Sequence, residues 1–288
     1  MKILIIQQAG HHQINRHFRE SLCLEYGFKK LGHEAIVWGD KYDNFTKESF
    51  DDLERWCDVI FVIENYYFDW IPSDKINQSK KIKVWWTIDS HASLLAHKNF
   101  ANKIMFDIIL SSTERYLSEY TNAKTYWFPN CYPDNLIYPH SDSEKSITFG
   151  FCGSLLPIRM PRINYMKENY NLQVDAYVMG DEMVSTIGSY FLHFNQNIGD
   201  DINYRTFETT GCRTALLTNY TDKLETLFDL DTELLTYKSE EDLYELLDRY
   251  LEDKESLLRI AHNGFKRASS NHTYTNRCQK FLEIIDNG

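Results

Sequence analysis

Long hydrophobic runs are absent from this chain of 288 residues. No stretch approaches the roughly 18 consecutive apolar residues that cross a membrane, and Val59–Ile63 is only long enough for a strand. The apolar segment within Met1–Gln8 is too short for the core of a signal peptide, and it is typical of a first buried strand. We therefore expect a cytoplasmic protein without a membrane span.

Close pairs of cysteines are also lacking. The six cysteines stand at positions 23, 57, 131, 152, 212 and 278, and this scattered spacing fits neither a disulfide framework nor a zinc site. We expect reduced thiols that are mostly buried.

Basic charge is scarce. The 42 Asp and Glu residues outnumber the 31 Lys and Arg residues, and the formal net charge is −11. Residues 222–255 hold 13 of the acidic residues and 4 of the basic ones, so one solvated helical face accounts for most of the surplus. This argues against nucleic acid at that face and leaves an anionic ligand elsewhere open. Lys80, Lys81 and Lys83 form one small basic cluster, which is not a DNA-binding groove.

What the chain contains is an alternation of strand and helix patterns from its first residue. Continuous apolar runs separated by helices predict parallel sheets that are covered on both faces. A turn-rich connector at 129–145 holds three of the six prolines, and all six tryptophans precede it. We predict an α/β protein with two Rossmann-like domains facing each other across a cleft. The first spans 1–138 and the second 139–288, with the last helix able to return to the first domain.

The expected elements follow from this alternation. Expected strands cover 2–7, 34–38, 58–64, 82–88, 106–111, 124–128, 146–152, 172–179, 190–195, 214–218 and 232–237. Expected helices cover 16–31, 48–57, 159–169, 203–211, 240–250, 254–268 and 275–285.

Polar residues at the carboxyl ends of the first domain's strands are site candidates, because open α/β sheets bind ligands there. Gly10 permits a tight turn, and His11 and His12 either contact an acceptor or are solvated loop histidines. Asp89 and His91 follow a buried strand. They either form a general-base pair that takes the proton of a hydroxyl acceptor or belong to a loop that caps the next helix.

The second domain opens with a strand, a loop and a helix that suit a diphosphate. Gly153 and Ser154 offer backbone amides, which bind anions. Arg159 and Arg162 offer charged hydrogen bonds to phosphate, unless they are simply surface arginines.

Glu208 is a charged residue inside a helix where folding does not require a charge. Asn203, Tyr204 and Arg205 place polar groups at the start of this helix, and free amides at a helix N-terminus bind phosphate or hydroxyl groups. We expect Glu208 to accept hydrogen bonds from a ribose diol. An ion pair with Arg205 or a surface position is the alternative. Two further residues are expected to pack and to C-cap the helix, respectively: Phe207 and Gly211.

The order of these motifs resembles the C-terminal domain of GT-B glycosyltransferases of the "glycosyl transferases group 1" type. The closest sub-type is the CgeB or spore-maturation-protein family. The resemblance covers about residues 125–285 and rests on segments in this order: Trp127-Phe128-Pro129-Asn130, Gly150-Phe151-Cys152-Gly153-Ser154 with Arg159, Asn203-Tyr204-Arg205-Thr206-Phe207-Glu208 with Gly211, and Arg259-Ile260-Ala261-His262-Asn263-Gly264 followed by His272-Thr273-Tyr274 and Arg277. The first domain is matched more loosely, through Gly10 and the turn at 31–34.

The resemblance implies a glycosyltransferase that moves a hexose or pentose from a nucleotide-diphosphate donor to a hydroxyl acceptor, without a cofactor or bound metal. Glu208 matches the family's ribose ligand, and Arg159 matches one of two basic ligands of the diphosphate. Arg162 is our candidate for the second ligand. Asp200 stands where the superfamily often has a glutamate. The Asp-x-Asp spacing of GT-A enzymes occurs only in the acidic segment, at 229–231.

The acceptor and the oligomeric state stay open. A glycan, a protein and a modified DNA base all fit the sequence as acceptors. We expect the donor to bind beyond residue 140 and the acceptor before it. Trp70, Trp85 and Trp86 are either stacking faces for the acceptor or core residues. The alternatives are a catalytically inactive binding or structural protein of this fold, and a nucleotide-sugar epimerase.

Overall fold

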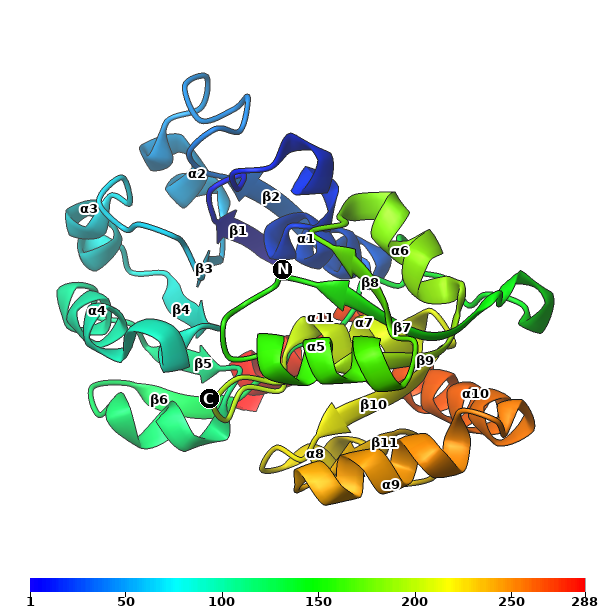
Figure 1. Cartoon of the computed structure of the whole chain (residues 1–288). Helices are drawn as coiled ribbons and strands as arrows, with labels where there is room; N and C mark the ends of the chain where they lie inside the picture. The colour runs from blue at the N-terminus through cyan, green and yellow to red at the C-terminus, as the bar shows by residue number, and fades with distance from the viewer. Residues whose placement is uncertain (288) are drawn as a thin grey trace. The chain divides into compact units, whose positions relative to one another are not determined.

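The computed structural model describes residues 1–287, which divide into two compact α/β units (Figure 1). Unit 1 is Met1–Asn130 together with the segment from Tyr274 on, and unit 2 is Cys131–Thr273. None of the helices in the described residues is long and apolar enough to cross a membrane. The six cysteines are free and buried, as expected.

Unit 1 is built on a six-stranded parallel sheet with the order β2-β1-β3-β4-β5-β6. Its strands are β1 (Lys2–Ile6), β2 (Glu34–Trp38), β3 (Val59–Ile63), β4 (Ile82–Thr87), β5 (Ile108–Ser111) and β6 (Lys124–Trp127). Its helices are α1 (Glu20–Lys30), α2 (Phe50–Trp56), α3 (Ser73–Gln78), α4 (Ser90–Lys103), α11 (Tyr274–Asn287) and the 3₁₀-helices η1 (Gln13–Phe18) and η2 (Glu114–Glu119). β2 lies on one side of β1, and β3 and the later strands lie on the other side. The winding of the sheet therefore reverses between β1 and β3.

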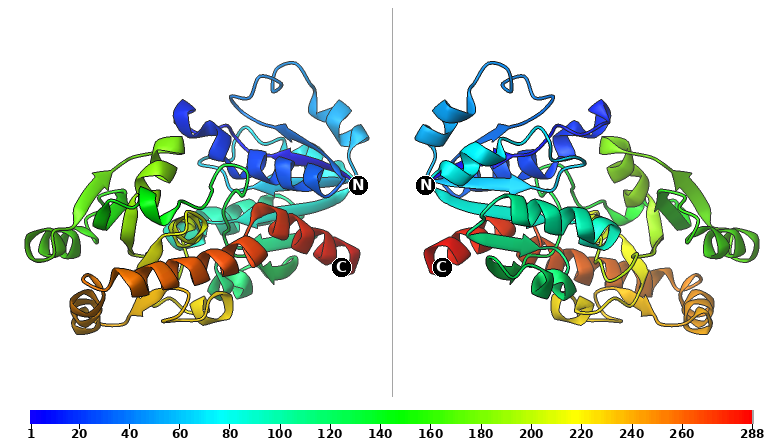
Figure 2. Two further views of the ribbon diagram at one scale, coloured as in Figure 1. Left: turned by 90° about the vertical axis from the view of Figure 1, so that its right-hand side faces the viewer. Right: turned by 90° about the vertical axis from the view of Figure 1, so that its left-hand side faces the viewer.

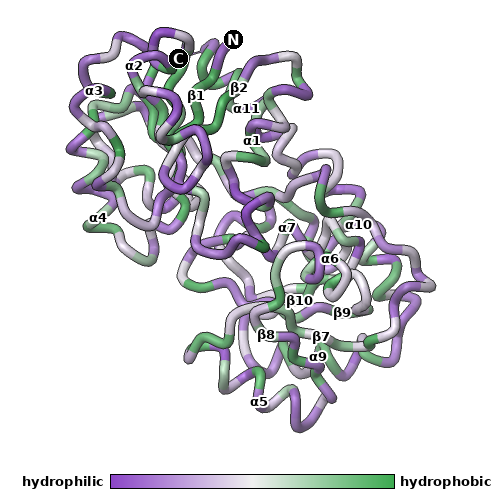
Figure 3. The backbone as a smooth tube through the Cα atoms, turned by 90° about the horizontal axis from the view of Figure 1, so that it is seen from above, coloured by the Kyte–Doolittle hydropathy of each residue, from purple (hydrophilic) through white to green (hydrophobic). Residues whose placement is uncertain are grey.

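Helices cover both faces of this sheet because its central strands are apolar throughout. All five residues of β3 are buried, and β1 is coloured as hydrophobic in Figure 3. On one face, Phe281 of α11 packs against Phe28 of α1 and Phe61 of β3, with ring centroids 5.3 and 4.4 Å apart. Both views of Figure 2 show α11 (red) along this sheet (blue to cyan). The other face buries Trp85 and Phe100 in a cluster with residues of α2 and α3.

Unit 2 is built on a five-stranded parallel sheet with the order β11-β10-β9-β7-β8. Its strands are β7 (Ile147–Gly153), β8 (Gln173–Ala176), β9 (Tyr190–Asn195), β10 (Ala215–Asn219) and β11 (Leu235–Tyr237). Its helices are α5 (Met160–Asn169), α6 (Gly180–Gly188), α7 (Tyr204–Gly211), α8 (Leu224–Leu227), α9 (Glu240–Tyr250), α10 (Lys254–Asn271) and the 3₁₀-helix η3 (Asp142–Glu144). Here the winding reverses between β7 and β9.

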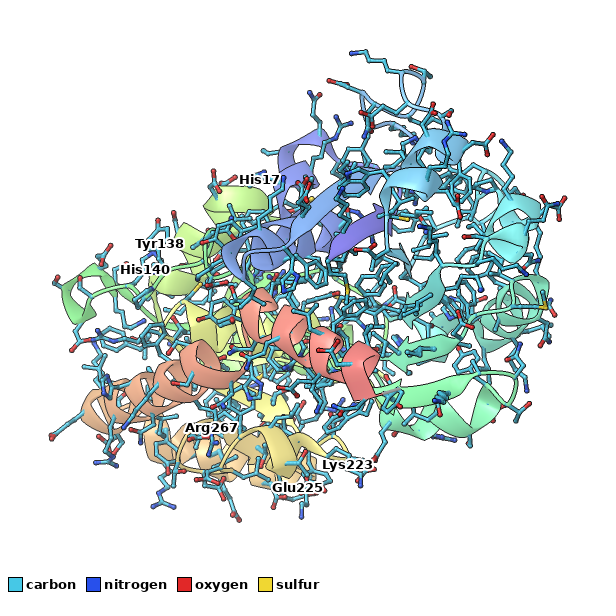
Figure 4. The ribbon with its side chains drawn as sticks, turned by 180° about the vertical axis from the view of Figure 1, so that it is seen from behind. His17, Tyr138, His140, Lys223, Glu225 and Arg267 are labelled. Atoms are coloured by element: carbon cyan, nitrogen blue, oxygen red, sulfur yellow. The ribbon has the colours of Figure 1, made fainter. Side chains whose placement is uncertain are left out.

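The connector between the sheets packs against unit 2. Tyr132 N donates to His272 O at 3.0 Å, and His140 N donates to Cys212 O at 3.1 Å. The rings of Tyr138 and His140 stack with centroids 4.9 Å apart (Figure 4). The division therefore falls between Asn130 and Cys131, within the predicted connector, whereas the sequence analysis set it after residue 138.

The structure differs most from the expected elements at helix boundaries. The helix expected over 16–31 is broken at Arg19, which has an extended backbone with φ −60° and ψ 139°. Helix α4 was not expected, because it is interrupted at Ser93 with φ −153° and ψ 56° and its hydrophobic periodicity is therefore poor. Helix α6 was not expected either, because it begins and ends in glycine, a weak helix former.

Candidate functional site

The carboxyl ends of β7 and β9 meet where the winding of the unit 2 sheet reverses, which is where open α/β sheets bind ligands. Arg159 is held at this place. Its Nε and Nη2 donate to Gln196 O at 3.2 and 2.9 Å, and its Nη1 donates to Ser154 O at 3.2 Å. The structure thus brings together Arg159 and Ser154, two of the residues expected at the donor site, beside Gly153.

The charge of Arg159 is not compensated by any carboxylate within ion-pair distance in residues 1–287. Burial, and then the nearby Arg205 guanidinium, lower the pKa of Arg159. A guanidinium that is partly desolvated and lies near a second one attracts an anion strongly.

Arg162 lies elsewhere. Its Nη2 is 3.4 Å from Oε1 of Glu240, at the start of α9. Arg162, the predicted second ligand of the diphosphate, is therefore paired with a carboxylate. It lies on α5, one turn beyond Arg159, and so contacts a different neighbour.

Asparagine side chains hold the start of α7 against the end of β9. Asn203 Nδ2 donates to Asn195 Oδ1 at 3.2 Å, and Asn197 Oδ1 accepts from Asn203 N at 3.2 Å. Asn197 N in turn donates to Asn219 Oδ1 at 2.6 Å. Because the Asn203 side chain is used in this network, it does not cap α7. The N-cap side chain therefore makes no hydrogen bond to the amides of the first turn of α7.

Glu208 pairs with Arg205 on the same helix. Arg205 Nη1 lies 2.5 Å from Glu208 Oε2, with 19% and 15% of the two side chains exposed. Burial lowers the pKa of Arg205 and Glu208 raises it, and the net shift is upward. The ion pair that the sequence left open as an alternative is present. Glu208 Oε1 makes no hydrogen bond within the described chain, so it is available to a hydroxyl group.

Phe207 and Gly211 of α7 are structural residues, as expected, although Gly211 is not the C-cap. Phe207 is fully buried against Phe228. Gly211 is not the C-cap, which is Cys212; a Cβ atom at position 211 would lie 2.7 Å from the Tyr132 ring. Glycine is needed there for close approach, which sequence reading could not distinguish from capping.

An apolar rim beside Gly153 was missed by the sequence analysis. Leu156, Ile158 and Tyr177 are 38%, 57% and 59% exposed. Tyr177 has a φ of +60°, which an aromatic residue rarely adopts, and its N donates to Gly153 O at 3.1 Å. Strained backbone held by a hydrogen bond is frequent at binding sites, so Tyr177 joins the candidates.

In unit 1, Asp89 follows the end of β4 and keeps an unused carboxylate. It is the N-cap residue of α4, yet its side chain makes no capping hydrogen bond, and within residues 1–287 it has no ion pair. Desolvation by the surrounding protein, and then the Glu64 and Glu20 carboxylates, raise the pKa of Asp89 to about 6, although its side chain is exposed. His91 is half-buried in the first turn of α4. The Asp89 side chain therefore does not cap α4, which was the alternative that the sequence left open.

A buried network lies directly beneath Asp89. Glu64 Oε1 is 2.9 Å from His97 Nε2, and Ile88 N donates to Glu64 Oε2 at 2.9 Å. His97 Nδ1 lies 3.1 Å from Thr87 Oγ1, which is 2.8 Å from Ser90 Oγ. The network fixes the turn that carries Asp89.

Sequence reading missed both acidic and basic members of this network. Glu64 directly follows a buried strand, which is the same signal that selected Asp89, and it could have been found by that signal. His97 lies inside an interrupted helix and gave no signal.

The loop after β1 takes the turn that Gly10 was expected to permit. Gly10 has a φ of +81°. The ring of His11 lies 4.4 Å from that of Tyr66 on the loop after β3, whereas His12 is exposed at the start of η1. Trp85 and Trp86 are core residues, because both are 0% exposed, and a stacking role for them is therefore wrong.

Among the residues the structure describes, no group of three or more His, Cys, Asp or Glu side chains is placed to hold a metal ion. The sites above are therefore two sets of polar side chains, one at the carboxyl edge of each parallel sheet.

Solved structures with this architecture are glycosyltransferases of the GT-B fold. An alpha-glucosyltransferase in complex with UDP-glucose and DNA containing an abasic site superposes with a TM-score of 0.75 at 12% identity, covering 99% of each chain. HepE from Anabaena in complex with UDP and glucose gives 0.65 at 12% identity, covering 100% of each chain. Sucrose-phosphate synthase from Thermosynechococcus elongatus gives 0.68 at 10% identity, covering 99% of this chain and 98% of that one.

The protein thus has the GT-B fold. The family model described as "Glycosyl transferase-like" matches residues 135–283, more than half of the chain. The protein belongs to this glycosyl transferase-like family. No curated protein matches it in sequence.

Proposed function

We propose that the protein is a glycosyltransferase that moves a sugar, a hexose or a pentose, from a UDP-sugar to a hydroxyl acceptor without a bound metal. Family membership supports the reaction class. The UDP or UDP-glucose complexes among the similar structures support the donor class. The order of the motifs supports the CgeB-like sub-type within the family.

Arg159 carries the proposal for the donor site. It is an arginine without a compensating carboxylate, held at the carboxyl ends of β7 and β9 by Gln196 O and Ser154 O. In glycosyl transfer the diphosphate leaves with a growing negative charge, and donors already in place stabilise that charge. Arg159, the Gly153 and Ser154 amides and the first turn of α7 would supply them.

Glu208 would bind the ribose through its unused Oε1. Its pairing with Arg205 neutralises Glu208, so a carboxylate next to a diphosphate does not repel it. Tyr177 would offer its exposed ring to the base or to the sugar.

Asp89 would activate the acceptor if transfer inverts the anomeric centre. The acceptor oxygen must then lose a proton, and a carboxylate with a pKa near 6 is well matched to that task at neutral pH. His91, two residues on, is the second candidate. If transfer retains the configuration, the leaving diphosphate can take the proton instead and no such base is needed.

Calorimetric titration with UDP tests the donor site. We expect Arg159→Ala to weaken UDP binding by about 2 kcal/mol or more, because charged hydrogen bonds are lost. Arg162→Ala is the matched control, since its partner is Glu240, and it should bind UDP almost as the wild type does.

UDP release from a panel of UDP-sugars tests the reaction. Release with one donor and an acceptor supports a transferase, whereas UDP binding without release under all conditions indicates an inactive binding protein. Interconversion of two UDP-sugars would show an epimerase. Equal UDP affinity of the wild type and Arg159→Ala would overturn the donor assignment.

A further inference from the structure

We infer that the acceptor is a neutral carbohydrate, which docks on a platform formed by Tyr66, His11 and Arg19 at the carboxyl edge of the unit 1 sheet. The inference rests on the proposed function, because it names the acceptor of that reaction. It also goes beyond that function, because the transferase class is compatible with protein and DNA acceptors as well.

The platform lies where the winding of the unit 1 sheet reverses, between β1 and β3. His11 is on the loop after β1, and Tyr66 is on the loop after β3. Their ring centroids are 4.4 Å apart, and the guanidinium carbon of Arg19 is 5.6 Å from the Tyr66 centroid. Tyr66 nevertheless keeps 62% of its surface exposed. A ring that is braced by two neighbours and still open to solvent is suited to stack on a flat ligand face.

Gln8 provides an independent sign of a ligand at this edge. Its side chain is only 2% exposed, yet its Nε2 and Oε1 have no hydrogen-bond partner within the described residues. Buried amides are almost always paired, and leaving one unpaired costs about 1–3 kcal/mol. An amide offers one donor group and one acceptor group, which match the hydroxyls of a sugar.

Gln8 is attached to both sides of the platform. Asn65, the neighbour of Tyr66, accepts from Gln8 N through Oδ1 at 2.8 Å. Arg19 Nε donates to Gln8 O at 3.3 Å. The residue that carries the unpaired amide is therefore joined through its backbone to Asn65, the neighbour of the stacking ring, and to Arg19.

The charge balance of unit 1 argues against a polyanion as the natural acceptor. Unit 1 has 18 Lys and Arg residues against 19 Asp and Glu residues, so it has no basic excess. Arg19 is already paired with Glu20, with Nη1 and Oε2 3.2 Å apart. A protein that binds DNA must neutralise several phosphates with Lys and Arg, and unit 1 has no excess of these residues. Stacking with hydroxyl recognition and little charge is the chemistry of a neutral sugar.

The first experiment measures UDP release by the full chain, with UDP-glucose, UDP-galactose and UDP-N-acetylglucosamine as donor probes. The acceptor probes are methyl glucosides, cellobiose, a serine-rich peptide and duplex DNA with 5-hydroxymethylcytosine. We expect a neutral saccharide to stimulate release. Stimulation by the peptide or the DNA alone would overturn the inference and leave the proposed function standing. Failure to bind UDP would overturn the proposed function itself.

The second experiment tests the platform through variants. Tyr66→Ala should raise the KM for the saccharide about tenfold and leave the donor KM unchanged, whereas Tyr66→Phe keeps the ring and should resemble the wild type. Tyr26→Ala is the matched control, because Tyr26 is also exposed and lies 5.5 Å from a cation, Lys30, on α1. Equal KM values for Tyr66→Ala and Tyr26→Ala would refute the platform.

Direct binding gives a readout that does not need turnover. Saturation-transfer NMR with the same saccharides should show ring protons in contact with the wild type, and the signal should be lost in Tyr66→Ala. If the wild type shows no saccharide contact in the presence of UDP, the inference is wrong.

Discussion

Glu64 Oε1 lies 2.9 Å from Nε2 of His97, with only 12% and 5% of the two side chains exposed. The second oxygen of Glu64 accepts the N–H of Ile88, the residue before Asp89. One carboxylate therefore fixes the backbone next to the candidate base and also sets the electrostatic field around it. The charges of Glu20, His97 and Arg19 also act on the pKa of Asp89.

The first prediction concerns Glu64→Gln. Glutamine can still accept the Ile88 N–H and donate to His97, but it removes a negative charge that raises the pKa of Asp89. We expect the acidic limb of the kcat/KM profile to move to lower pH, with the fold retained. Glu64→Ala should instead lower the unfolding free energy by about 1–3 kcal/mol, because Ile88 N–H loses its partner. A pH profile of Glu64→Gln identical to that of the wild type would show that Glu64 does not tune Asp89.

The second prediction concerns Asp89→Asn and follows from the sign of the pKa shift. The pKa of Asp89 is raised from 3.8 to about 6, so the folded protein disfavours the ionised form. Protonated Asp89 therefore contributes to the free energy of unfolding. This contribution is fully present below about pH 4 and is lost as the pH rises through about 6. Asp89→Asn should therefore gain stability over the wild type across this window, and urea unfolding at several pH values checks it. A difference that does not change with pH would contradict the shift.

Activity of the same variant is the third prediction. If the product shows inversion of the anomeric centre, Asp89→Asn should lower kcat by about 10²–10⁴-fold while UDP affinity stays nearly constant. His91→Ala is measured in parallel, since His91 is the second candidate. An inverting enzyme that keeps full activity in both variants would mean that the base lies elsewhere.

The fourth prediction separates the two roles of Glu208. If Oε1 binds the ribose diol, Glu208→Ala should weaken UDP binding by about 1.5–3 kcal/mol. The variant should bind the 2′,3′-dideoxy analogue of UDP as the wild type does, because that analogue has no diol. If Glu208 only holds Arg205 in place, both ligands will lose the same affinity. Thermal unfolding of the variant serves as the control for the unpaired Arg205.

The fifth prediction concerns Gly211→Ala. Alanine is the better helix former by about 1 kcal/mol, but its Cβ would lie 2.7 Å from the Tyr132 ring. We expect the overlap to dominate and the unfolding free energy to fall by about 1–3 kcal/mol. In a Tyr132→Ala background the cost should shrink, which a double-mutant cycle in urea measures. The same cost in both backgrounds would point to a different cause.

Most of the fold could be predicted from the sequence, because long apolar runs and helix caps are local signals. The strand at Tyr190–Asn195 and the helix at Glu240–Tyr250 match the expected ranges. The helix at Ser90–Lys103 could not be predicted, because its break at Ser93 removes the periodicity that sequence reading relies on.

The sequence by itself determined which residue types stand at the carboxyl ends of buried strands, and this is why Asp89 and Arg159 could be selected as candidates. Only the tertiary structure decided what those side chains do. It gave Arg162 a carboxylate partner, left Arg159 without one, and paired Glu208 with Arg205. It also brought Glu64 and His97, which are 33 positions apart, into contact beneath Asp89. Strand order sets these encounters, and strand order depends on long-range packing that no local segment of the sequence encodes.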